Sequence, residues 1–149
     1  KSMSCYELVK EFKKKYPTTV AWRLYQNARV IDEHINPGEV VKYAFAGQKN
    51  DSMLDIFQTA VVAITNKRIL IGQKRVLFGY ALNSITPDLY NDMQVYETIF
   101  WGKIVIDTVK EQLIISNLAK DSLFELETVI SEFMMEEKKN YAPHSHEKH

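Results

Sequence analysis

Apolar residues near the N-terminus recur at helical spacing. Ser4 and Glu7 have the Ser-x-x-Glu spacing of a capping box, in which each side chain accepts a hydrogen bond from the other residue's backbone amide. A first helix is therefore predicted over residues 4–15, before a proline. A second helix is predicted to begin with a threonine cap at position 18 or 19. The Asn-Pro-Gly segment at 36–38 ends it.

The pattern changes after this segment to short runs of β-branched and aromatic residues with turn residues between them, which is typical of strands. The seven predicted strands cover residues 39–46, 56–64, 68–72, 76–81, 93–100, 103–107 and 111–117. Most links are of hairpin length, and Pro87 argues against a strand in the longer connection 85–92. An antiparallel meander of this kind must close or fold on itself to bury one face, so a small barrel is predicted.

The helical period then returns. Ser122 and Glu125 repeat the capping-box spacing, and one apolar stripe continues to about Lys139. A terminal amphipathic helix is suited to cover the open mouth of a seven-stranded barrel. Residues 140–149 show no period and are predicted to form a mobile tail. The predicted α+β chain thus has three parts: an N-terminal helical extension (1–38), a barrel with its capping helix (39–139) and the tail (140–149).

Composition limits what the chain can do. Its 149 residues, 46% hydrophobic and 26% charged, suit one globular domain with an ordinary core. Lys and Arg number 19 and balance 19 Asp and Glu, so no global field attracts polyanions, and nucleic-acid binding is not expected. A single cysteine excludes an internal disulfide and a cysteine-rich zinc site. No signal-peptide pattern or bilayer-length apolar run is present, so a cytoplasmic location is expected.

Catalytic and metal-binding patterns are weak. The five glycines are scattered, so no phosphate-binding loop is present, and neither a Gly-x-Ser-x-Gly nor a His-Glu-x-x-His motif occurs. His144, His146 and His149 lie in the predicted tail, where adventitious metal binding is the simplest interpretation. We therefore predict no catalytic residue, no metal site and no cofactor.

The segment AITNKRILIGQKRVLFGYALNSITPD resembles bacterial pleckstrin-homology-like domains. The likeness lies in a strand ending in Thr-Asn-Lys-Arg, a short strand, and an aromatic-Gly pair that leads to a Ser-Ile segment. GKIVIDT and LFELETVISEF are similar to the closing strands and helix of the YokE-like group of that superfamily. The resemblance covers about residues 39–139. It implies a pleckstrin-homology-like seven-stranded antiparallel barrel capped by a C-terminal helix, and a non-enzymatic binding platform.

Eukaryotic relatives that bind phosphoinositides carry a basic cluster across the first two strands. The matching segment here, GQKNDSMLD, offers Lys49 alone beside Asp51 and Asp55. This departure argues against phosphoinositide binding.

Four cations that lie close in sequence belong to two different hairpins. Successive hairpins of a meander lie at alternate ends of the sheet, so Lys67 and Arg68 are predicted to lie opposite Lys49, Lys74 and Arg75. We interpret the first two as completing a hairpin. The other three are candidates for holding an anionic ligand or lipid headgroup. The alternative is that these turn cations are simply solvated and keep edges from pairing.

Four aromatic residues are candidates for interaction. Neighbouring strand positions face opposite sides, so either Phe100 or Trp101 is expected to meet solvent or a partner. Trp22 and Tyr25, on the second predicted helix, either dock against the barrel or contact another chain. Core or turn packing is the alternative role for these side chains.

Together these features favour a non-catalytic binding or assembly module. Its partner would be an unidentified protein, or a second copy joined through an exposed sheet edge. The alternative is a peripheral membrane adaptor that binds anionic headgroups through Lys49, Lys74 and Arg75. The two differ in salt dependence, because headgroup attachment weakens steeply as ionic strength rises.

Overall fold

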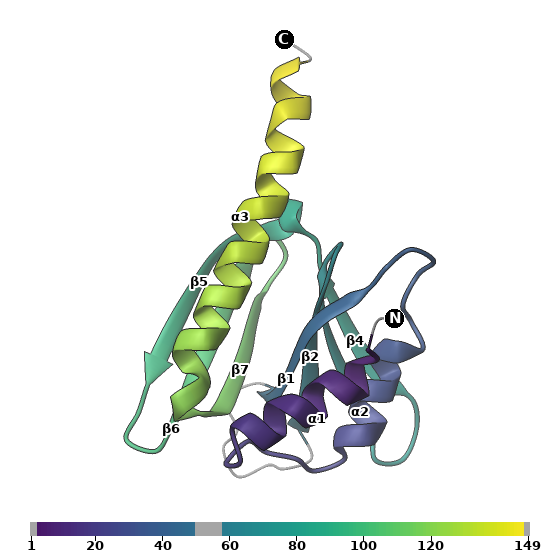
Figure 1. The fold of residues 1–149 in the computed structure, drawn as a ribbon, viewed down its shortest axis with the longest axis vertical. Coiled ribbons are helices and arrows are strands. Elements are labelled where there is room, and N and C mark those ends of the chain that lie inside the picture. The colour runs from purple at the N-terminus through teal and green to yellow at the C-terminus, as the bar shows by residue number, and fades with distance from the viewer. Residues whose placement is uncertain (1–2, 50–57, 148–149) are drawn as a thin grey trace.

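The computed structural model describes residues 3–49 and 58–147, with side chains up to residue 136 in the last helix. Seven strands form one antiparallel sheet in the order β4-β3-β2-β1-β7-β6-β5. They are β1 (Val41–Lys49), β2 (Thr59–Thr65), β3 (Ile69–Lys74), β4 (Tyr80–Ile85), β5 (Tyr90–Glu97), β6 (Trp101–Thr108) and β7 (Gln112–Ala119). Figure 1 shows the sheet curled into a half-barrel, with β5 to β7 on one side of the interior and β1 to β4 on the other. The predicted α+β fold, with N-terminal helices and a C-terminal helix around these strands, is confirmed.

The first helix, α1 (Cys5–Lys15), begins as its sequence predicts. The Glu7 amide donates to Ser4 Oγ at 3.1 Å, and the Ser4 amide donates to Glu7 Oε1 at 2.9 Å, which completes the capping box. Asp32, at the end of α2 (Leu24–Asp32), accepts from the next two amides of α1, those of Cys5 and Tyr6, at 2.8 and 3.3 Å. The end of the second helix therefore caps the start of the first.

The second helix starts later than predicted. Positions 18 and 19 precede α2 rather than capping it, because the Lys13 ammonium binds the carbonyls of Pro17 and Thr19, at 2.5 and 2.7 Å, and holds this segment as a loop. Arg23, at φ +56°, then turns the chain into α2.

One strand is also displaced from its predicted position. The segment predicted as a strand at 76–81 becomes a hairpin turn, because the Arg75 amide bonds the Gly79 carbonyl at 3.1 Å and Gly79 adopts φ +72°. β4 accordingly begins at Tyr80, and a short 3₁₀ turn, η2 (Pro87–Leu89), replaces the longer predicted connection. The other strands agree within about three residues at each end, and positions 56–57 of the second predicted strand lie outside the described residues.

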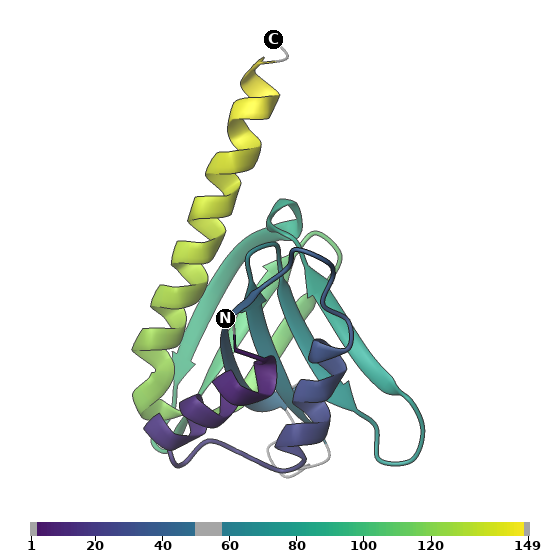
Figure 2. The same ribbon diagram turned by 45° about the vertical axis from the view of Figure 1, so that its right-hand side comes forward.

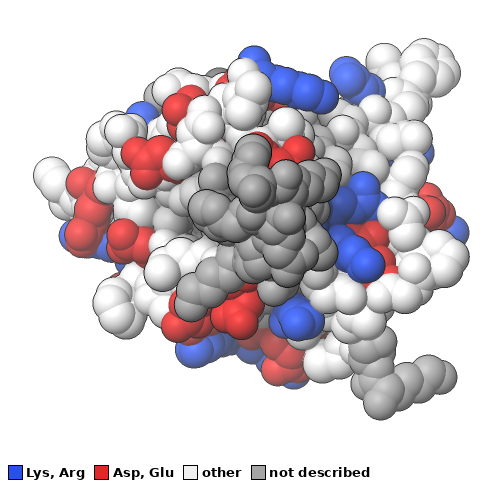
Figure 3. All heavy atoms as spheres, turned by 90° about the horizontal axis from the view of Figure 1, so that it is seen from above, with Lys and Arg blue, Asp and Glu red and all other residues white. Residues whose placement is uncertain are grey.

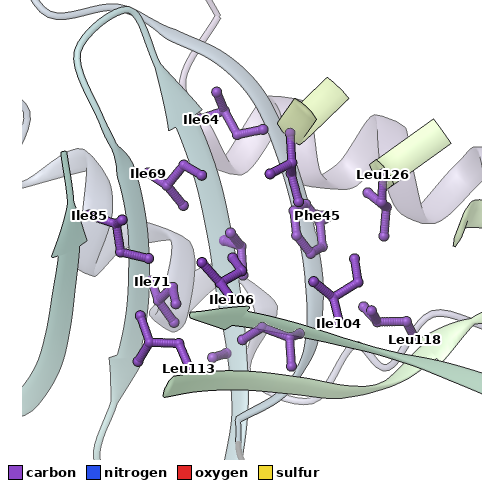
Figure 4. Packing of buried hydrophobic residues seen from close by; sticks show 14 of the residues in the cluster. Phe45, Ile64, Ile69, Ile71, Ile85, Ile104, Ile106, Leu113, Leu118 and Leu126 are labelled. Carbon is purple, nitrogen blue, oxygen red and sulfur yellow. The ribbon is translucent and has the colours of Figure 1, made fainter. Parts of the chain in front are cut away.

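The sheet buries apolar side chains on both faces. Inside the curl, isoleucines and leucines of both halves surround Phe45, and Leu126 of α3 (Leu123–Glu147) covers them (Figure 4). On the outer face, Val9 of α1 and Ile31 of α2 pack against β1, β2 and β3. Phe12 of α1 joins the inner cluster, with its ring centroid 6.0 Å from that of Phe45. The N-terminal helices therefore pack on their own barrel.

Two glycines allow helices to approach the sheet closely. A Cβ on Gly72 of β3 would lie 2.8 Å from the Ile31 side chain, so α2 rests directly on this strand. A Cβ on Gly102 of β6 would clash with Leu123, the first residue of α3. Residues of any other type would push both helices outward.

The C-terminal helix is longer than predicted. It continues past Lys139 to Glu147, and its last turns extend beyond the strands (Figures 1 and 2). The predicted mobility of residues 140–149 stays a prediction, and positions 148–149 lie outside the described residues. None of the described helices is long and apolar enough to cross a bilayer.

Candidate functional site

The β3–β4 hairpin presents an apolar tip to solvent. Because residues 76–78 form the turn, their side chains have no sheet to pack against: Val76 is 51% exposed, Leu77 82% and Phe78 83%. Lys74 and Arg75, both exposed, precede this tip directly. Three consecutive exposed apolar residues are unusual on a monomeric surface, so this tip is a candidate contact site.

A second apolar tip lies on the β5–β6 hairpin. The Thr98 hydroxyl donates to the Trp101 carbonyl at 2.7 Å and closes the turn, which leaves Ile99 78% and Phe100 74% exposed. Trp101 is half-buried, with its ring centroid 5.9 Å from that of Phe100. In both ribbon views this hairpin and the β3–β4 hairpin point to the end of the molecule opposite the C-terminus (Figures 1 and 2).

The three candidate headgroup cations do not form one cluster. Burial lowers the pKa of the Lys49 amine, the Arg75 charge lowers it further, and Glu111 acts in the opposite direction, so Lys49 and Arg75 lie within electrostatic reach of each other. Lys74 instead lies on the outer face, where it lines a cavity of about 330 Å³ with Tyr25 and other side chains of α2. Of the three cations, Arg75 acts electrostatically on Lys49, while Lys74 lies in the outer-face cavity.

Arg68 is fully engaged within the fold. Its guanidinium donates to both carboxylate oxygens of Glu39, at 2.9 and 3.0 Å, and also to the His34 carbonyl and Ser84 hydroxyl. The Glu39 side chain is 1% exposed, and that of Arg68 18%. Arg68 therefore completes the hairpin structurally, while Lys67 beside it is exposed.

The two aromatic candidates of the N-terminal region differ in exposure. Tyr25 of α2 is 47% exposed and packs edge-on against Tyr6 of α1, with centroids 4.9 Å apart. Trp22, in the loop before α2, is half-buried and stacks with the Arg23 guanidinium at 5.3 Å. Each side chain thus contacts a neighbour within the N-terminal region, and Tyr25 remains nearly half exposed.

Glu125 was not recognised from the sequence as an interaction centre. Its predicted capping box with Ser122 is wrong, because the Ser122 hydroxyl donates to the Ala119 carbonyl and the Glu125 carboxylate turns toward α1 and β1. There it accepts from Lys15 at 2.5 Å, Tyr16 at 2.7 Å and Tyr43 at 2.6 Å. Burial raises the pKa of the Tyr43 phenol, and its bond to Glu125 raises it further. No sequence signal links Glu125 to residues that lie 82 and 110 positions away.

Reactive chemistry is poorly supported. Within the described part of the chain, no three His, Cys, Asp or Glu side chains converge to hold a metal ion. The side chains of His144, His146 and His149 lie outside that part. Cys5 is buried, and burial together with Asp32 raises the pKa of its thiol, which disfavours the nucleophilic thiolate. Figure 3 shows Lys and Arg interspersed with Asp and Glu on the face that carries the C-terminal helix, rather than one region of a single sign.

Comparisons with known proteins agree with this architecture. The model of the family described as "Bacterial PH domain" matches residues 35–132. Among solved structures, the chain is similar to a pleckstrin homology domain from Shewanella amazonensis SB2B, with a TM-score of 0.52 and 14% identity, over 74% of this chain and 86% of that one. At this identity the likeness shows the fold alone. No curated protein sequence matches the chain significantly. The predicted resemblance to bacterial pleckstrin-homology-like domains is thus confirmed for fold and family.

Proposed function

This chain belongs to the bacterial PH domain family, and from that membership we propose that it is a non-catalytic cytoplasmic module that binds a protein partner. Within the family we assign it to the YokE-like group. The observation that carries the proposal is the pair of apolar hairpin tips, at Leu77–Phe78 and at Ile99–Phe100. Burying a side chain of this size contributes roughly 1.5–3 kcal/mol, so a partner that covers both tips gains substantial binding energy.

The positions of the aromatic residues also support a protein partner. Phe100 is exposed at its tip and its ring lies against that of Trp101 at an angle of 40°, which suits an aromatic anchor in a protein–protein contact. Tyr25 of α2 offers a further contact on the outer face, where it lines a cavity with Lys74.

A peripheral membrane adaptor is the second candidate function. The observation that favours it is the position of Arg75, which directly precedes the exposed apolar tip of the β3–β4 hairpin and whose charge lowers the pKa of Lys49. Cations beside exposed apolar side chains suit an anionic bilayer surface. In this reading Lys49 and Arg75 contact headgroups, Lys74 adds positive charge from the outer face, and Leu77 and Phe78 enter the interface.

Site-specific cross-linking tests the first proposal. A photoreactive phenylalanine analogue is placed at Phe78 or at Phe100 in the chain expressed in its native host, with position 109 as control. Val109 is 66% exposed but lies on the β6–β7 turn, away from both tips. We expect a covalent protein adduct of one discrete mass from positions 78 and 100 and none from position 109. A lack of protein adducts at both tips would overturn the proposal.

Vesicle co-sedimentation tests the alternative. Neutral phosphatidylcholine and anionic phosphatidylglycerol vesicles are compared at low and near-physiological salt, with Lys74→Glu/Arg75→Glu beside the parent chain. Lys42→Glu on β1 is the control for a change of charge. The membrane adaptor is supported if the parent chain and Lys42→Glu bind anionic vesicles and the double variant does not. It is ruled out if the parent chain binds no vesicles at either salt concentration.

A further inference from the structure

The outer side of β4 combines a free strand edge with two cavities. Among the described residues β4 pairs with β3 alone, so its other edge presents unpaired backbone amides and carbonyls. Leu82 lies opposite Gly72, the residue of β3 that faces α2, so alternate positions of β4, namely Tyr80, Leu82 and Ser84, face the side that carries α2.

The first cavity lies at the Tyr80 end of this face. It has a volume of about 330 Å³, and its lining includes Arg29, His34 and Lys74. The His34 ring is held by the Val30 carbonyl at 2.6 Å and the Tyr80 hydroxyl at 2.9 Å. Because a carbonyl can only accept, His34 Nδ1 donates to the Val30 carbonyl. Its other ring nitrogen, Nε2, then lies beside the Tyr80 hydroxyl.

The second cavity lies at the Ser84 end. It has a volume of about 420 Å³ and is lined by Lys67, Arg68, Ser84 and neighbouring residues of the 36–39 segment. Arg68 connects the two ends, since it donates to the Ser84 hydroxyl at 3.2 Å and to the His34 carbonyl at 3.1 Å.

The charges of the two cavities leave one unpaired cation in each. Arg29 pairs with Glu33 at 3.0 Å, and Arg68 pairs with Glu39 at 2.9 Å. Lys74 in the first cavity and Lys67 in the second form no ion pair within the described residues. The face therefore complements a ligand with two negative groups.

We propose that an acidic peptide binds along β4 as an added strand, with one carboxylate in each cavity. Every second side chain of a strand lies on the same face. Tyr80, which lines the first cavity, and Ser84, which lines the second, are four positions apart on β4. The ligand's acidic residues are therefore also four positions apart. A second copy of this chain is a poorer occupant. Its β4 edge, YALNSI, contains no acid, and the acids of its other edge strand, Asp92 and Glu97 of β5, are five positions apart and so face opposite sides.

The inference rests on the proposed function as a protein-binding module, but its test is independent of the hairpin tips. The probes are two fluorescent seven-residue peptides of threonine, valine and glutamate with identical composition. One carries its two glutamates four positions apart and the other carries them three apart. We expect the first to bind about three- to tenfold more tightly by fluorescence anisotropy, because only its two carboxylates share a face.

Variants of the protein and of the peptide identify the contact. Lys67→Glu and Lys74→Glu are each expected to weaken the four-apart peptide about three- to tenfold, whereas Lys42→Glu leaves its affinity unchanged. Replacing both glutamates by lysine restores binding to the Lys67→Glu/Lys74→Glu variant. N-methylation of the peptide backbone abolishes binding, since it removes the ladder hydrogen bonds.

Equal affinity for the two spacings, or no affinity for either, overturns the inference. If the tip cross-links form while both peptides fail, the acidic-strand inference falls and the protein-binding proposal stands. If the chain instead dimerises in solution and Lys67→Glu/Lys74→Glu has no effect on the dimer, the free edge belongs to a second copy and the acidic ligand is excluded.

Discussion

Arg68 is the residue that joins the β2–β3 turn to the rest of the outer face. It is the only cation paired with Glu39 among the described residues, and the Glu39 side chain is nearly inaccessible to solvent. Replacing Arg68 by alanine would leave this carboxylate buried without a counter-charge. We expect Arg68→Ala to lower the free energy of unfolding by about 3–5 kcal/mol, measured by urea denaturation followed by circular dichroism.

Lys67→Ala, in the same turn, is the matched control and is expected to change stability by less than about 0.5 kcal/mol. If both substitutions lowered the stability equally, the loss would come from any change in the turn and not from the broken Arg68–Glu39 ion pair.

Acid titration gives a second readout of this ion pair. Burial alone would raise the pKa of the Glu39 carboxyl, but hydrogen bonds from Arg68, Thr65 and the Asn36 amide outweigh it and hold the pKa below its usual value. Because the folded-state pKa of Glu39 lies below the unfolded-state value of about 4.3, its carboxylate stabilises the fold fully above about pH 4.3. This stabilisation is lost as the pH falls from there through the folded-state pKa. Arg68→Ala should therefore show a shallower loss of stability below about pH 4 than the parent chain.

At the scale of elements, local patterns predicted more than long-range ones. The start of α1 was readable because its two capping residues lie three positions apart, and the strands were readable from their β-branched runs. The β4 shift was not, because the residues 76–78 have strand-like composition and only the conformation of Gly79 makes them a turn. The outer cavities were not readable either, because the one at Lys74 is formed with α2 and the one at Lys67 with the 36–39 segment, both distant in sequence.

The contact of α1 with α3 is likewise invisible to any local pattern. Its centre is Glu125, which links Lys15 and Tyr16 of the α1 end to Tyr43 of β1. Glu125→Ala removes the acceptor of a half-buried phenol and is expected to cost about 2–3 kcal/mol, since hydrogen bonds to a charged group are each worth about 1.5–3 kcal/mol. Hydrogen exchange at the amides of the last turn of α1 should accelerate.

Glu127→Ala, an exposed carboxylate on the same helix, is the control for helix propensity and charge. Unchanged exchange in α1 after Glu125→Ala, with stability lost as predicted, would mean that the packing of Val9 and Phe12 is enough to hold this helix.

At the scale of the molecule, the two faces of the sheet are covered by different helices. The inner face is closed by α3 and Phe12, the outer face is covered by α1 and α2, and the hairpin tips remain at one end. The N-terminal helices pack on β1 to β3 and reach Leu82 of β4, but no strand pairs with the outer edge of β4 among the described residues, so this edge stays open beside them. α2, which helps to complete the core, therefore also forms one wall of the proposed peptide strip at its Tyr80 end.

The family match begins at residue 35, yet the fold depends on residues before it. A chain that starts at Glu39 would expose the outer cluster, including Val41, Val61 and Leu70, which are now at most 7% exposed. Each such side chain is worth roughly 1.5–3 kcal/mol when buried, and the total stability of a domain is only about 5–15 kcal/mol. We expect this truncated chain to aggregate or to lack a cooperative thermal transition by circular dichroism. Removal of residues 140–149, which lie beyond the family match, should leave that transition in place, and a soluble, cooperatively folded 39–149 chain would show that the helices are a dispensable addition to the barrel.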